Sequence, residues 1–182
     1  MVEFEIPSPS ARRRLQAAFA ARSGAGDLLQ HAPGAAAGIA ASRLYRHATA
    51  RGGDDPELTQ ALRENLMLRR AYVRLERSLA RLRMPALRAA SSGDFPARRI
   101  PGCRLRVERS AADSAQYYLV IEFEDGLDDA SRPDTMVLVD RDEQCHRFAL
   151  PAARRGVIQH LIDGASAMLP LLRDPQTEVM LR

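Results

Sequence analysis

The sequence predicts an α+β protein, with a small N-terminal helical bundle followed by a C-terminal antiparallel β-sandwich or small barrel. Before residue 85, apolar residues recur every three or four positions, which is the period of a helix. After Cys103 they alternate with polar residues, which is the period of a strand. Between these patterns, residues 85–102 contain three prolines and two glycines, a composition typical of irregular connections. We therefore expect a helical domain over residues 1–85, a linker over 86–101 and an antiparallel β domain over 102–182.

The first residues predict two short elements ahead of the main helices. Val2, Phe4 and Ile6 alternate with glutamates, which favours an edge strand. Ser10 is a suitable cap for a helix that continues to Arg22. The stretch 34–51 is compatible with a further helix, so the N-terminal part holds three or four helices.

Residues 56–84 carry the longest helical pattern in the chain. Asp55 is a good N-cap, and Pro56 suits the first helical position because its missing N–H costs nothing there. No glycine or proline follows until Pro85, which ends the pattern. The apolar side chains that we expect on one face of this helix are Leu68, Tyr72, Leu75, Leu79 and Leu82.

An arginine stripe is expected on the opposite face of the same helix. Its members, Arg70, Arg74, Arg77 and Arg81, follow the apolar residues by two positions, about 200° of helical rotation. One interpretation is a solvated face, partly paired with Glu76 or with acidic residues elsewhere. The other is a docking face for an acidic protein partner or for a phosphate backbone. The four arginines are therefore the candidate partner-binding residues.

Six strands are expected after the linker, in the spacing of an antiparallel sandwich or barrel. The polar run 140–144 predicts a tight turn between two of them. The expected strands are 103–107, 117–123, 136–139, 145–150, 157–162 and 177–181.

Charge is unevenly distributed along the chain. All 27 basic residues are arginines. Residues 1–100 contain 17 arginines and 9 acidic residues, a net charge of +8, and residues 101–182 contain 10 and 14, a net charge of −4. Such asymmetry predicts either that the two parts attract each other or that they face different partners.

Composition also indicates where the protein acts. No apolar run approaches the ~20 residues of a membrane span. The first ten residues lack the layout of a secretory signal, so we expect a cytoplasmic protein without membrane contact. Two cysteines, Cys103 and Cys145, do not make a disulfide framework and are expected as buried thiols, with a single bridge as the alternative in an exported protein.

The sequence gives little support for a catalytic site or a cofactor-binding motif. His160 and Asp163 are a candidate base and orienting group, but no nucleophile motif accompanies them. Cys145 and His146 are adjacent in an expected strand, so their side chains point to opposite faces. Zinc-ligand spacing and the phosphate-binding and dinucleotide-binding glycine motifs are absent. We therefore expect no catalytic residue, no metal and no cofactor. Binding of a protein partner is the first function that we expect. Nucleic-acid binding through the arginine-lined helix is the alternative, and an enzyme that uses His160 is the third.

The run DDPELTQALRENLMLRRAYVRLERSLARLR, residues 54–83, resembles the last helices of helical anti-sigma-factor domains. The shared features are a D-P-x-L start, an L-R-x-x-Y/L middle and a leucine-spaced end. A β-rich module after a linker is also similar to the layout of several anti-sigma factors. The resemblance implies a non-enzymatic bacterial regulator or adaptor that binds a protein partner, for instance a sigma factor. This chain lacks the H-x-x-x-C-x-x-C zinc signature and the membrane span, so the resemblance implies a soluble variant. Only the apolar helix face carries over.

Overall fold

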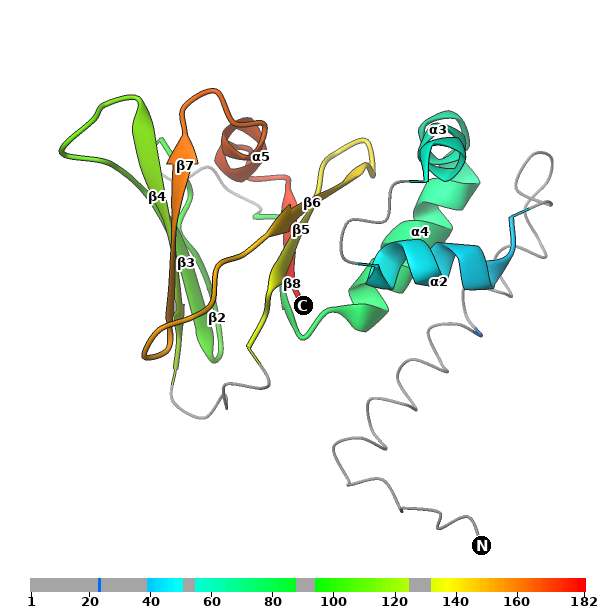
Figure 1. Ribbon diagram of the computed structural model, residues 1–182, viewed down its shortest axis with the longest axis horizontal. Helices are drawn as coiled ribbons and strands as arrows, with labels where there is room; N and C mark the ends of the chain where they lie inside the picture. Colours follow the sequence, from blue (N-terminus) through cyan, green and yellow to red (C-terminus); the bar gives the residue numbers. More distant parts are fainter. Residues whose placement is uncertain (1–22, 24–38, 51–54, 88–93, 125–131) are drawn as a thin grey trace, which may run out of the picture. The chain divides into compact units, whose positions relative to one another are not determined.

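The computed structural model describes residues 23, 39–50, 55–87, 94–124 and 132–182. The chain divides into two compact units, Met1–Leu79 and Ala80–Arg182, called here the helical unit and the β unit. The first contains helices, and the second contains two four-stranded antiparallel sheets with one short helix (Figure 1). This is the predicted α+β class. The strand and helix predicted over residues 2–22 lie outside the described residues.

Three helices of the helical unit are described, α2 (Ala41–Thr49), α3 (Pro56–Glu64) and α4 (Leu66–Leu79). The predicted start at Asp55 is confirmed, because its carboxylate accepts a hydrogen bond from the N–H of Leu58 at 3.0 Å and Pro56 follows it. The predicted apolar face is buried at Leu68, Tyr72 and Leu75.

The prediction of one uninterrupted helix over residues 56–84 is wrong at Asn65. Its backbone is extended, and its N–H donates to the carbonyl of Ala61 to end α3. Its side-chain oxygen then accepts a hydrogen bond from the N–H of Leu68 at 3.0 Å, as an N-cap does for α4. A short amide side chain can replace backbone hydrogen bonds in this way, which is why asparagine favours helix ends.

Each sheet of the β unit has four antiparallel strands. One has the order β1 (Leu82–Met84), β8 (Glu178–Leu181), β5 (Thr135–Val139), β6 (Cys145–Ala149). The other has the order β2 (Arg98–Ile100), β3 (Cys103–Arg109), β4 (Gln116–Phe123), β7 (Val157–Asp163). All six predicted strands are present, with ends that differ by one or two residues.

Two strands were not predicted, and both lie where the sequence indicated something else. β1 occupies Leu82–Met84, the predicted end of the long helix, because these residues pair with β8 at the other end of the chain. β2 lies inside the predicted linker, between Pro96 and Pro101. It is an edge strand, where prolines nearby interrupt no hydrogen-bonded ladder. The turn to β3 ends at Gly102, whose φ of +82° suits glycine.

One hydrophobic cluster contains residues from both sheets and from helix α5 (Met168–Arg173). In β4, Tyr117, Leu119 and Ile121 are buried on one face, as the alternation predicts. β8 departs from its predicted alternation, since all four of its residues are buried between neighbours on both sides. Its Glu178 is 7% exposed and forms an ion pair with Arg83 at 2.8 Å.

The boundary between the units follows Leu79, six residues before the predicted end of the helical domain. The helical unit contains 12 arginines and 8 acidic residues, and the β unit contains 15 of each. With the chain divided after Leu79, the helical unit has a net charge of +4 and the β unit a net charge of zero.

Candidate functional site

The exposed side of α4 combines apolar and cationic side chains. Arg70, Arg74 and Arg77 are exposed along this helix, as predicted. Met67 precedes Arg70 by three positions and so lies on the same face. Met67 and the adjacent Leu66 have 42% and 43% of their surface exposed. We call these five residues the α4 surface. The two apolar members were missed, although the spacing of Met67 from the arginines was a visible signal.

Arg81 does not belong to this surface. α4 ends at Leu79, and Arg81 lies in the β unit directly before β1, where its N–H donates to the carbonyl of Leu181 at 2.8 Å. The prediction of a four-arginine helical stripe is therefore wrong at Arg81, because the chain pairs with β8 there and the helix has ended.

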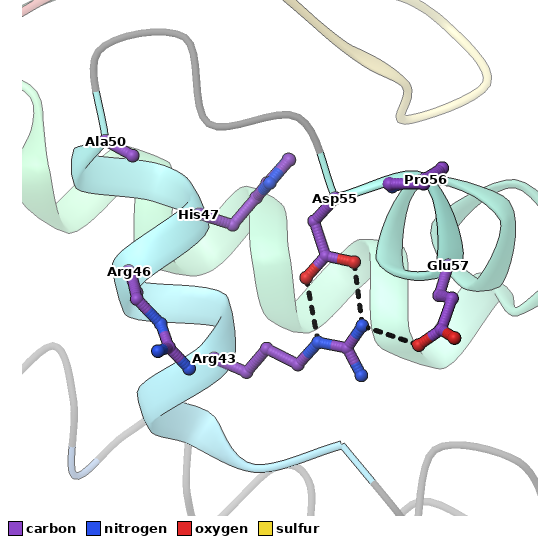
Figure 2. A pocket seen from close by; sticks show the side chains of 7 residues that line it. All are labelled: Arg43, Arg46, His47, Ala50, Asp55, Pro56 and Glu57. Atoms are coloured by element: carbon purple, nitrogen blue, oxygen red, sulfur yellow. Dashed lines mark hydrogen bonds and ion pairs between the residues drawn. The ribbon is translucent and has the colours of Figure 1, made fainter.

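A second feature of the helical unit is a cavity of about 510 Å³ between α2 and the start of α3. Figure 2 shows Arg43 of α2 reaching across to the carboxylates of Asp55, which caps α3, and of Glu57 in its first turn. Its Nε and Nη2 atoms bind the two oxygens of Asp55 at 2.8 and 2.7 Å, and Nη2 also lies 3.0 Å from Glu57. Arg46 and His47 also line the cavity. Sequence reasoning missed this arrangement, because Arg43 lies in α2 and Asp55, twelve residues away, caps the next helix.

Asp55 has two roles in this arrangement. It caps α3, and it anchors α2 through the bidentate contact with Arg43. The Arg43 guanidinium, and next the Leu58 N–H, lower the pKa of the Asp55 carboxyl from 3.8 to about 2. The same pairing raises the pKa of Arg43. This ion pair therefore persists throughout the neutral and mildly acidic range.

We expect the helical unit to lose stability as the pH falls from about 4 to about 2. A carboxyl whose folded pKa is lowered stabilises the fold above its unfolded pKa of 3.8, and the effect is lost as it becomes protonated near pH 2. Asp55→Asn keeps the capping oxygen and removes the charge, so its stability should depend less on pH in this interval. Urea unfolding followed by far-UV circular dichroism at several pH values measures this. Glu64→Gln, an exposed acid of the same helix, should keep the wild-type dependence. Identical pH profiles for wild type and Asp55→Asn would contradict the assignment.

The histidines of the β unit are arranged differently from the sequence-based candidate pair. His160 and Asp163 are three apart in β7, so they lie on opposite faces, with His160 on the side of the buried Ile158 and Ile162. The Asp163 carboxylate accepts a hydrogen bond from the N–H of Ala165. Instead, Nε2 of His146 lies 3.0 Å from Asp140, across the predicted turn. The carboxylate of Asp140 also accepts hydrogen bonds from the N–H groups of Asp142 and Gln144, so its role is to stabilise the turn.

Both cysteines are free thiols. Cys103 is buried, as predicted, and burial together with the charge of Glu124 raises the pKa of its thiol to about 12. A thiol with so high a pKa is a poor nucleophile at neutral pH. Cys145 is only half-buried, in the edge strand β6.

Within the described residues, no three histidine, cysteine, aspartate or glutamate side chains come together in a way that could hold a metal ion. No helix in the same part of the chain is long and apolar enough to cross a membrane. Comparison with protein-family models, with curated proteins and with solved structures found no match.

Proposed function

We propose that this protein is a non-enzymatic regulator or adaptor that binds a protein partner through the α4 surface. The observation that carries the proposal is the exposure of Leu66 and Met67 directly beside three exposed arginines. Among the described residues, Leu161 is the other large apolar side chain with comparable exposure, and it lies in the β unit. Methionine and arginine are enriched in protein–protein interfaces, where apolar anchors desolvate and guanidinium groups supply directional contacts.

The chemistry of the α4 surface indicates the kind of partner. Two apolar side chains at one end and three arginines along the helix match an amphipathic helix that carries acidic residues. The net charge of +4 on the helical unit would attract such a partner over a longer range. The resemblance of residues 54–83 to anti-sigma-factor domains makes a sigma factor the first partner to test. A cytoplasmic location is part of the same proposal.

Nucleic-acid binding is the second candidate, because Arg70, Arg74 and Arg77 lie on one helix face as phosphate-binding residues would. Leu66 and Met67 favour the protein partner, since phosphate contacts need no apolar anchors. The two functions differ in their response to salt. For nucleic acid, the logarithm of the binding constant should fall steeply and linearly with the logarithm of the salt concentration. Affinity for a protein partner that is held by apolar side chains should weaken only modestly.

We expect Met67→Glu to reduce partner recovery by roughly 30-fold, the effect of losing an apolar hot spot worth about 2 kcal/mol. The measurement is affinity capture with the tagged full-length chain from its native host, with quantitative mass spectrometry of the partner. Arg70→Gln, Arg74→Gln and Arg77→Gln together should reduce recovery further and make the remainder less sensitive to salt. Leu161→Glu is the matched control, because it adds the same charge at an equally exposed apolar position of the β unit. Equal losses for Met67→Glu and Leu161→Glu would refute the role of the α4 surface.

The finer architecture belongs to the same proposal. We infer that the two sheets are the layers of a β-sandwich with α5 packed against their shared core, which is supported by the hydrophobic cluster that contains residues of both sheets and of α5. In the helical unit, the buried faces of α2, α3 and α4, with Leu44, Leu58 and Leu68 fully buried, support a small bundle. In this arrangement the β-sandwich serves as a scaffold or recognition module for the regulator.

A further inference from the structure

Two arginines and two aromatic rings form a connected row in the β unit. The guanidinium of Arg109 lies over the ring of Tyr117, 5.6 Å from its centroid, and that of Arg173 lies over the ring of Phe95 at 4.9 Å. The two rings contact each other edge to face, with centroids 5.5 Å apart. We call these four residues the Arg–aromatic row. Its connectivity means that both cations are held on one continuous aromatic support.

Separate parts of the chain build the row. Arg109 ends β3 and is the register partner of Tyr117 in β4, to whose hydroxyl its Nη2 also donates at 3.1 Å. Phe95 precedes β2, and Arg173 is the last residue of α5. Sheet pairing fixes Tyr117, and Phe95 packs against the hydrophobic cluster, so the fold holds both rings that support the guanidinium groups before any partner arrives. Such preorganisation reduces the entropy lost on binding.

The cations of the row are exposed, whereas the rings beneath them are covered. Arg109 and Arg173 are both exposed, Phe95 is half-buried and only 8% of the Tyr117 surface is accessible. Neither guanidinium forms an ion pair with a carboxylate of the described residues. An arginine over an aromatic ring keeps N–H donors at its edge, and these match a carboxylate in a two-point hydrogen bond.

We propose that the Arg–aromatic row is a docking surface for an acidic peptide segment, with Arg109 and Arg173 each receiving a glutamate or aspartate side chain. The covered rings favour a peptide over single-stranded nucleic acid, whose bases require open aromatic faces for stacking. The zero net charge of the β unit also favours local carboxylate pairing over the broad positive field that a nucleic-acid backbone needs. This surface is independent of the α4 surface and lies in the other unit.

The test is fluorescence anisotropy with a labelled peptide of about eight residues in which glutamate and glycine alternate. The protein is the full-length chain carrying Arg70→Gln, Arg74→Gln and Arg77→Gln, so that the α4 surface cannot supply the binding. We expect Arg109→Gln and Arg173→Gln each to weaken binding about fivefold or more, because each removes a charge-assisted pair. Phe95→Leu keeps both charges but removes the support of Arg173, and it should weaken binding about twofold to fivefold.

Arg104→Gln is the matched control, since Arg104 is an exposed arginine of β3 outside the row. It should leave binding within about twofold of its parent. The proposal is overturned if Arg104→Gln weakens binding as much as Arg109→Gln, which would indicate nonspecific attraction. It is also overturned if the peptide does not bind, or if a labelled oligothymidylate binds more tightly than the peptide. The test protein already lacks the three arginines of the α4 surface. Failure of this proposal therefore does not bear on the proposed partner-binding function, which its own experiment tests.

Discussion

Replacing Arg98 by methionine should raise the free energy of unfolding of the β unit by about 1–3 kcal/mol. Arg98 is only 1% exposed, and one of its nitrogens, Nη2, donates to the carbonyl of Asp174 at 3.0 Å. Its Nε and Nη1 atoms have no hydrogen-bond partner among the described residues. Burial accordingly lowers the pKa of Arg98. A buried cation with unsatisfied donors costs more than an apolar side chain of similar length.

The methionine variant leaves no new unsatisfied group in its place. The N–H of Thr177 also donates to the Asp174 carbonyl, at 3.1 Å, so this oxygen keeps a partner. Urea unfolding of the purified chain measures the change. Arg99→Met, at the exposed neighbouring position of β2, should alter stability by less than about 0.5 kcal/mol. A clear loss of stability in Arg98→Met would show that the buried charge is satisfied in the folded protein.

Truncating Ile121 to alanine should lower the stability of the β unit by about 2–5 kcal/mol. Ile121 is fully buried in β4, and its register partners Leu105 and Ile158 are buried on either side. Removing its side chain leaves a cavity that the surrounding strands cannot close without breaking their pairing. If the two sheets share one core, Ile121→Ala should accelerate amide hydrogen exchange in β5 and β8 by the same factor as in β4, relative to the wild type.

The exposed Leu161 provides the control for this truncation. Leu161→Ala in β7 removes a similar apolar volume at a position that is 48% exposed, and it should cost well under half as much. Hydrogen exchange that accelerates only in β3, β4 and β7 would argue against a shared core and therefore against the proposed sandwich. Unchanged exchange in α4 would indicate that the helical unit opens independently of the β unit.

Local sequence signals predicted the elements that depend on contacts or patterns between residues close together in the chain. Asp55 caps α3 through an N–H three residues away, and the two-residue alternation around Leu119 places a whole strand face in the core. The same reasoning failed at Asn65, where a short amide side chain outweighed an otherwise continuous helical pattern. The arginines of the α4 surface could be predicted because they obey the helical period. Its apolar members follow the same period, so they were within reach of the sequence as well.

The sequence by itself determined the α+β class, the start of α3, the buried face of α4 and the positions of six of the eight strands. The tertiary structure alone decided that residues 82–84 form a strand, since their hydrogen bonds go to residues almost a hundred positions away. It also decided the burial of Arg98, the bridge from Arg43 to Asp55 and the Arg–aromatic row. Each of these depends on side chains from different elements, and a contact between distant residues leaves no periodic trace in the chain. Periodicity therefore reports which face of an element is buried, and only the fold reports what that face meets.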